Sequence, residues 1–152
     1  MTLAALLALL HVGGAFLFVG GYIATNVLTE LARRSTDEPS LRAALGFSGW
    51  FDRRLLIPFA TVSAIAGLAL VPARGYAWTA TWIVASTLLY LAVMLVGIFV
   101  WGPRGGRIEA ALTAGRIEDA RSLLAESRFV LLSRVENVTL AVIVALMILR
   151  PG

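Results

Sequence analysis

The length, composition and charge of this chain point to a membrane protein. Of its 152 residues, 59% are hydrophobic and 14% are charged, against about 45–50% and about 25% in an average soluble domain. A soluble domain of this size could not bury that much apolar surface. We therefore expect an all-α, polytopic membrane protein, a four-helix transmembrane bundle with short amphipathic cytoplasmic helices, built as a single membrane domain over residues 1–152.

The charged and sulfur-containing residues exclude several reaction classes. The net charge is +4, all 13 basic residues are Arg, and the chain has neither Lys nor Cys. Lysine general bases, lysine Schiff bases, disulfides, thiolate nucleophiles and iron–sulfur clusters are therefore excluded. The sequence also lacks the nucleophile-elbow, P-loop and His-Glu-x-x-His patterns. No motif identifies a catalytic activity, and the sequence favours a non-enzymatic protein.

The first span is expected over residues 3–28. This uncharged run is interrupted only by His11 and has no basic residue before it. It is also longer than the roughly 7–15 residues of a signal-peptide core. We therefore expect it to remain in the mature protein as a helix.

A break over residues 35–40 follows the first span. Pro39 suits the first turn of a helix, and the residues after it predict a short helix at the membrane surface over residues 41–45. The second span is expected over residues 55–71. Pro72 and Gly75 are expected to end it.

The second half of the chain contributes two more expected spans, over residues 76–102 and 129–149. The first of these carries no charge and has Trp residues at both ends, as in the aromatic belts of membrane helices. Between the two spans, residues 103–128 contain the sequence Gly-Arg-Ile-Glu twice. Two amphipathic helical turns separated by a glycine predict a helical hairpin on the membrane surface.

The arginines are distributed unevenly between the expected loops. Loops 29–54 and 103–128 carry ten of them, whereas the opposite side carries only Arg74 and Arg150. Arginines in short loops favour the cytoplasmic side of the membrane. We therefore expect a multi-pass protein of the inner (plasma) membrane, with both of these loops cytoplasmic and both termini outside the cytoplasm. Anionic lipid headgroups then account for the positive charge, and no nucleic-acid partner is expected.

Four groups of short motifs follow one another along the chain: Leu10–Ala15 with Gly20–Gly21, Pro58 with Gly67–Leu68, Trp82 with Trp101–Pro103, and the ending Leu146–Pro151. Their order and spacing resemble a family of small predicted integral membrane proteins of unknown function. The resemblance covers nearly the whole chain and implies a fold without an activity. A His in a Gly-rich first helix is also distantly similar to the copper-resistance CopD membrane domain and to HemJ-type protoporphyrinogen oxidases, but this chain lacks the lysine on which their chemistry depends.

His11, the only histidine, is the strongest candidate for chemistry. An imidazole inside the hydrocarbon needs a partner, so we expect it to face the bundle interior. It then either donates a hydrogen bond to a backbone carbonyl, Ser or Thr of another helix, or ligates haem b or copper. With one His in the chain, haem would require His11 from two subunits, Met147 as the second ligand, or five-coordinate iron.

Glycines lie on and beside the helical face that carries His11. Gly14 is one turn beyond it and leaves room for a flat macrocycle or for the close approach of another helix. The pairs Gly13 with Gly20 and Gly14 with Gly21 are each seven residues apart. This spacing is typical of tight helix packing in membranes.

A second group of polar residues is expected at the cytoplasmic mouth of the bundle. Arg134, Glu136 and Asn137 lie in the first turns of the fourth span, and Asp52 and Arg53 fall at the same expected level. Such a cluster is either an interfacial ion network that docks the fourth helix or a gate or proton path.

Two hypotheses for the function follow. The first is a non-enzymatic accessory or self-associating subunit of a membrane complex, with lipids and other membrane subunits or a second copy as partners. The second is a redox or porphyrin-handling protein that binds haem b or copper through His11, next to Gly14, with Met147 as a second ligand. A small transporter is a weaker third, because four helices without an inverted repeat would need to oligomerise.

Overall fold

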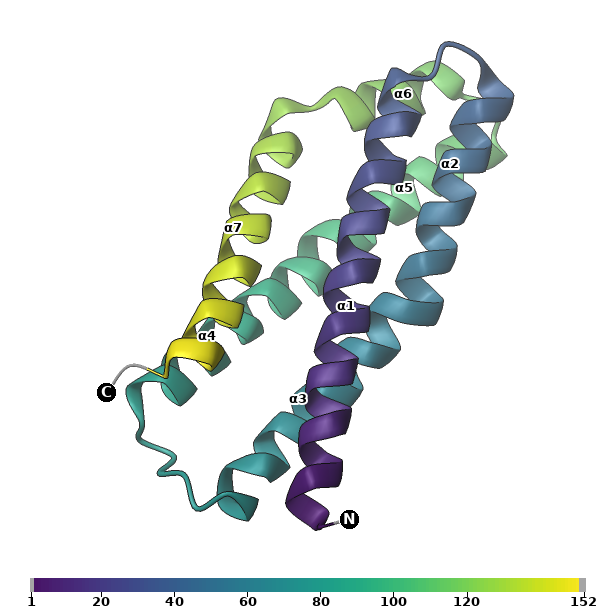
Figure 1. Ribbon diagram of the computed structural model, residues 1–152. Coiled ribbons are helices and arrows are strands. Elements are labelled where there is room, and N and C mark those ends of the chain that lie inside the picture. The colour runs from purple at the N-terminus through teal and green to yellow at the C-terminus, as the bar shows by residue number, and fades with distance from the viewer. Residues whose placement is uncertain (1, 151–152) are drawn as a thin grey trace. The chain divides into compact units, whose positions relative to one another are not determined.

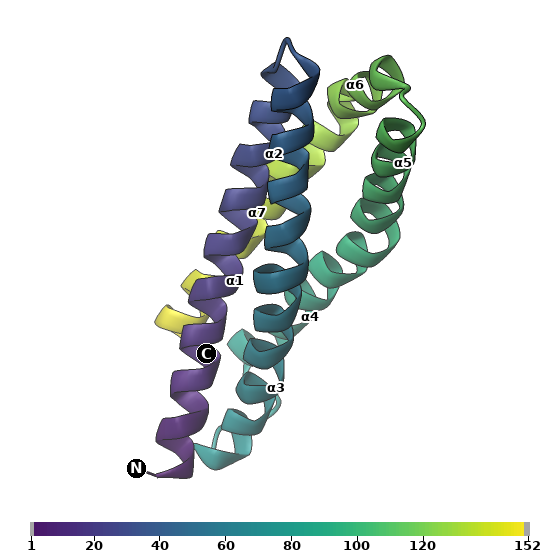
Figure 2. The same cartoon turned by 90° about the vertical axis from the view of Figure 1, so that its right-hand side faces the viewer.

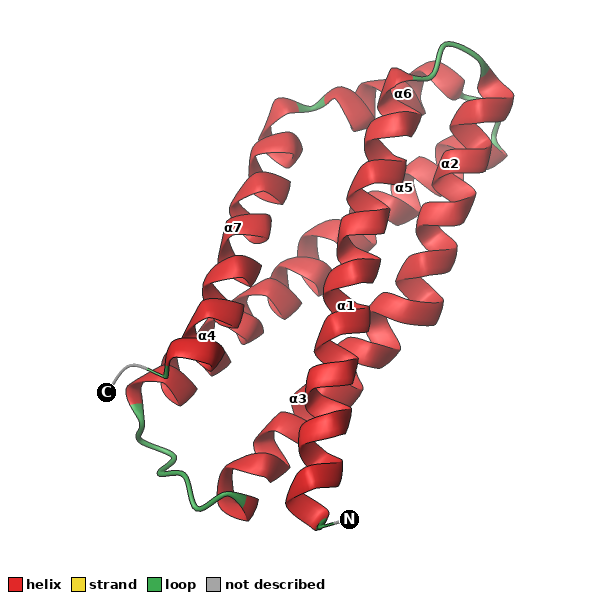
Figure 3. Ribbon diagram, in the orientation of Figure 1, coloured by secondary structure: helices red, strands yellow, loops and turns green. Residues whose placement is uncertain are grey.

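The computed structural model describes residues 2–150, which form helices joined by short loops (Figure 3). The expected all-helical fold with four candidate membrane spans is confirmed. The described residues divide into two compact units after Trp78. Four helical stretches are long and apolar enough to cross a membrane: Leu3–Arg34, Glu38–Ala73, Thr81–Thr113 and Ser127–Leu149.

The first unit is an antiparallel pair of long helices. Helix α1 spans Leu3–Arg34, and it lies alongside a second helix that reverses direction after a short turn (Figures 1 and 2). This second helix consists of α2 (Glu38–Phe51), the π-helical segment η1 (Asp52–Leu56) and α3 (Ile57–Ala73).

The caps of the first unit follow the sequence signals. The Asp37 side chain accepts a hydrogen bond from the backbone N–H of Ser40, and Pro39 sits in the first turn of α2, where its missing N–H is not needed. At the other end, Gly75 adopts the left-handed conformation with φ +69°. The N–H of Tyr76 then donates to the carbonyl of Val71 at 3.0 Å, which closes α3.

The expected separate surface helix over residues 41–45 is wrong, because α2 continues without a break through η1 into α3. The π-helical segment lies directly before Pro58, which has no N–H to donate within the helix. Instead, the N–H of Ile57 donates to the carbonyl of Asp52, five residues earlier. Widening the helix by one residue thus accommodates the proline.

The second unit contains α4 (Thr81–Val96), η2 (Gly97–Trp101), α5 (Gly102–Thr113), α6 (Ile117–Ala125) and α7 (Ser127–Leu149). Helix α4 packs against α7, and α5 packs against α6. The second π-helical segment, η2, again lies directly before a proline, Pro103, and the N–H of Gly102 donates to the carbonyl of Gly97. In both long composite helices, a π-helical segment therefore accommodates a proline within a continuous helix.

The bounds of the third expected span and of the hairpin differ from the expectation. The helix begins at Thr81 and not at residue 76, and residues 76–80 form a turn and irregular backbone instead. The hairpin over residues 103–128 is present as α5 and α6, with Gly115 at φ +71° between them. Its first helix, however, is the continuation of α4 and not a separate surface helix.

Candidate functional site

His11 ties α1 to α3. Its Nδ1 lies 2.8 Å from the backbone carbonyl oxygen of Ser63, and the Ser63 hydroxyl donates to the backbone carbonyl of His11 at 2.9 Å. Because a carbonyl oxygen only accepts, Nδ1 must carry the ring proton, and this tautomer places the lone pair on Nε2. The hydrogen bond to a carbonyl of another helix is one of the two interactions that the sequence predicted for His11.

Glycines make this contact possible. An ideal Cβ on Gly67 would lie 2.6 Å from His11 Nδ1, and one on Gly14 would lie 3.1 Å from the Cβ of Ser63. Two turns further, a Cβ on Gly21 would lie 3.5 Å from the Cβ of Leu55. Gly14 and Gly21 therefore serve close helix packing, and the space beside Gly14 is occupied by α3.

The other glycine pair of α1 points elsewhere. An ideal Cβ on Gly13 or Gly20 would meet no atom within 4 Å. Consecutive residues of an α-helix are separated by about 100°, so this pair is turned away from α3. We call this side of the helix the outer face of α1; it comprises Leu9, Gly13, Phe16, Gly20 and Ile23, of which Leu9, Phe16 and Ile23 are 63%, 78% and 54% exposed.

Met147, the expected second haem ligand, lies on α7 in the second unit and is partly buried. His11 belongs to the first unit. A ligand pair of His11 and Met147 therefore stays a prediction. Within residues 2–150, no group of three or more acidic or His side chains is placed to hold a metal ion.

The polar residues of the fourth span point in different directions, as their spacing predicts. Glu136 is buried, and its Oε2 accepts a hydrogen bond of 2.6 Å from the indole N–H of Trp101. Arg134 is exposed, and the Asn137 side chain donates to the carbonyl of Ser133 on its own helix. The buried carboxyl is thus the residue of this group that links α7 to η2.

Asp52 and Arg53, the other two members of the expected cluster, lie in the first unit on η1. Asp52 is half-buried, and Arg53 is exposed with its guanidinium close to Gly49. Their expected approach to the fourth span stays a prediction.

Arg104 is a buried residue that the sequence did not single out. Only 5% of it is exposed, and its Nη2 donates to the carbonyl of Leu123 at 2.6 Å. Its guanidinium carbon lies 4.1 Å from the ring centre of Phe129 and 5.4 Å from that of Trp101. Its burial depends on the continuity of α4 with α5 through η2, which no local signal in the sequence indicates.

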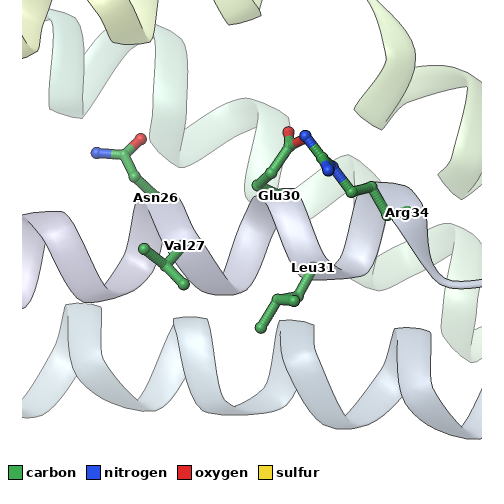
Figure 4. Close-up of a pocket in the computed structure, with 5 residues that line it drawn as sticks. All are labelled: Asn26, Val27, Glu30, Leu31 and Arg34. Atoms are coloured by element: carbon green, nitrogen blue, oxygen red, sulfur yellow. The ribbon is translucent and has the colours of Figure 1, made fainter.

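A shallow groove runs along the C-terminal part of α1. Figure 4 shows Glu30 pointing toward Arg34 at its rim, and the Glu30 carboxylate also accepts from Arg33 at 2.7 Å. The groove is lined by Asn26, Val27, Glu30, Leu31 and Arg34. These partners satisfy the charge of Glu30 within one helix, so the groove offers no unpaired carboxylate.

The sequence matches one known family. Residues 5–151 fit the family described as "Predicted integral membrane protein (DUF2269)". No curated protein and no solved structure matches the chain. The more distant similarity to CopD and HemJ proteins is not shown by any of these comparisons.

The family match and the four apolar helices agree with each other. The match covers nearly the whole chain, and the family description confirms the expectation of an integral membrane protein. Four helices of sufficient length and apolar character make the protein multi-pass. The chain therefore belongs to the DUF2269 family of predicted integral membrane proteins.

Proposed function

We propose that this protein is a non-enzymatic membrane subunit that assembles with a second copy of itself through the outer face of α1. One observation carries the proposal. Helix α1 has two glycine pairs with the same spacing of seven residues, and the pair Gly14 and Gly21 packs against α3 while Gly13 and Gly20 have no neighbour. Gly13 and Gly20 therefore offer another helix the same close approach that Gly14 and Gly21 offer to α3.

The physical basis is helix association in lipid. Apolar side chains gain little by leaving lipid for another helix, so association depends on close van der Waals contact between backbones. Gly13 and Gly20 allow such an approach, and Phe16 and Ile23 supply large side chains that fit into the facing helix. The glycines of the outer face can therefore receive the large side chains of the same face on a second copy, as a self-complementary surface requires.

A half-buried imidazole and a buried carboxyl group support a structural role and not a catalytic one. The imidazole Nδ1 of His11 is engaged by the backbone of Ser63, and the carboxylate of Glu136 is engaged by Trp101. Each bond joins two different helices within one unit. Polar groups placed this way stabilise helix packing inside an apolar environment.

The proposal includes an orientation. Both termini are placed outside the cytoplasm and loops 29–54 and 103–128 inside, in the inner membrane, because ten arginines lie in these two loops. The chain has no Cys, so a single cysteine reports one position without background. A membrane-impermeant thiol reagent added to intact cells should label Thr79→Cys but not Ala114→Cys. The reverse labelling pattern would overturn the orientation.

Self-association is tested by the mass of the purified protein in mild detergent. The wild type should have the mass of a dimer, and Gly20→Leu that of a monomer. Gly46→Leu is the matched control, because a Cβ on Gly46 also meets nothing within 4 Å but lies on α2. A monomeric wild type, or a dimer that Gly20→Leu leaves intact, would contradict the proposal.

A haem b or copper protein is the second candidate, and one observation favours it. Ligating histidines usually donate their other ring N–H to a carbonyl or carboxylate, as His11 Nδ1 does to Ser63. An absorption spectrum and a metal analysis of the purified protein test it. A Soret band that disappears in His11→Ala would support this candidate, and a colourless, metal-free protein would remove it.

A further inference from the structure

A groove in the second unit combines arginines with apolar side chains. It lies where η2 passes into α5 and where α7 begins. Its lining includes Phe99, Pro103, Arg107, Arg128, Phe129 and Leu132. All of these residues belong to one unit, so the groove is formed within it.

The groove carries an excess of positive charge. Arg107 is exposed and makes no ion pair with another described residue, whereas Arg128 is paired with Glu126 and lies 4.7 Å over the ring of Phe129. The buried Arg104 lies within electrostatic range of both arginines and of Glu126. The groove therefore contains two arginines, Arg107 and Arg128, and Glu126 pairs with Arg128 only, so positive charge is in excess there.

The polar and apolar parts of the groove are separated along the helix axis. Phe99 belongs to η2, at the end of an uncharged span, and is 70% exposed. Arg107 lies two turns further along α5, beyond the interfacial Trp101. On the facing helix, Leu132 lies one turn from Arg128 toward the apolar part of α7. The apolar side chains are therefore on the membrane side and the arginines on the loop side.

We propose that this groove binds one anionic glycerophospholipid from the leaflet on the arginine-rich side. The phosphate is held by Arg107 and by the N–H groups of Arg128 that Glu126 does not use, and an acyl chain lies along Phe99 and Leu132. A guanidinium offers five donors, so Arg128 can serve Glu126 and a phosphate together. The order of arginines and apolar side chains matches the order of headgroup and acyl chain in a lipid.

The site does not depend on self-association, because no residue of the outer face of α1 takes part in it. Gly20→Leu should therefore bind the lipid as the wild type does. This variant keeps a failure of the lipid site distinguishable from a failure of the proposed dimer.

The test is native mass spectrometry of the delipidated full chain in mild detergent, titrated with dioleoyl phosphatidylglycerol. The wild type should retain one molecule in preference to dioleoyl phosphatidylcholine. Arg107→Gln should raise the phosphatidylglycerol concentration for half-saturation by roughly tenfold, as expected for the loss of one charge-assisted contact. Arg116→Gln is the matched control, since Arg116 is exposed, pairs with Asp119 and lies outside the groove.

Three results would overturn the proposal. They are equal retention of the two lipids, an unchanged titration in Arg107→Gln, and full competition by inorganic phosphate at the same concentration, which would indicate an anion site without a lipid. If Arg107→Gln does not fold, Phe99→Ser tests the acyl-chain half of the site. It should weaken phosphatidylglycerol retention, and unchanged retention there would equally contradict the assignment.

Discussion

The two units of this protein hold polar side chains between their helices in opposite ways. In the first unit, His11 reaches the backbone of Ser63 because Gly14 and Gly67 bring two helices into close contact. In the second unit, the large rings of Trp101 and Phe129 surround the charged groups of Glu136 and Arg104. The contact in the first unit depends on glycines, which have no side chain, and the contacts in the second unit depend on large aromatic side chains. A larger side chain in place of a glycine should therefore destabilise the first unit, and the loss of a contact between an aromatic ring and a charged group should destabilise the second.

Gly14→Leu should have the largest effect. An added Cβ would already lie 3.1 Å from Ser63 and 3.2 Å from the carbonyl oxygen of Phe59, so a leucine must separate α1 from α3. We expect a loss of about 3 kcal/mol of stability, the upper end of the usual cost of overpacking, or failure to accumulate as folded protein. Thermal unfolding in detergent measures it. Gly46→Leu is the control, since a Cβ on Gly46 meets nothing within 4 Å and Gly46 lies outside the outer face of α1. Equal unfolding temperatures for the two variants would contradict the contact.

Trp101→Phe should have an intermediate effect on the second unit. The change keeps most of the ring volume but removes the N–H that donates to Glu136, which is 3% exposed. A buried carboxylate left without this donor should cost about 1–3 kcal/mol. Trp50→Phe is the control because Trp50 is half-exposed on α2.

The same bond can be isolated by a double-mutant cycle. Glu136→Met should destabilise the wild type more than it destabilises Trp101→Phe, because methionine has no oxygen to accept the indole N–H and the second background has already lost the donor. Additive effects of the two substitutions would show that the Trp101 to Glu136 bond contributes no coupling energy.

Ser63→Ala should have the smallest effect of the three. It removes the hydroxyl that donates to the His11 carbonyl at 2.9 Å but keeps the backbone carbonyl that accepts from Nδ1. A loss of about 1 kcal/mol is expected for one hydrogen bond. Thr61→Ala is the matched control, since its hydroxyl bonds within its own exposed helix face. A loss as large as that of Gly14→Leu would mean that the hydroxyl, and not the glycine contact, holds the helices together.

The sequence predicts much of this fold because local signals act within one turn of a helix. The apolar runs mark all four candidate spans, Asp37 and Pro39 mark the start of α2, and Gly75 marks the end of α3. The continuity of α2 with α3 and of α4 with α5 was missed. It depends on π-helical turns before Pro58 and Pro103, and polar residues near a proline read more readily as the end of a helix.

The candidate site is less accessible to sequence reasoning because its contacts are long-range. The kind of partner for His11 follows from the cost of burying an imidazole, but nothing local distinguishes Ser63 from the other Ser and Thr residues of the spans. The two glycine pairs of α1 also look alike in sequence. Only the position of α3 separates the pair that packs from the pair that is exposed. Arg104 was counted among the loop arginines because helix continuity decides its burial.

Cysteine cross-linking in native membranes tests the central claim most directly, because the chain contains no Cys. Phe16→Cys and Ile23→Cys lie on the outer face of α1, whereas Leu10→Cys and Leu17→Cys lie on other sides of the same helix and are also exposed. Oxidation should produce covalent dimers from Phe16→Cys and Ile23→Cys and not from Leu10→Cys and Leu17→Cys. Cross-linking that is absent from all four, or equal in all four, would contradict assembly through this face.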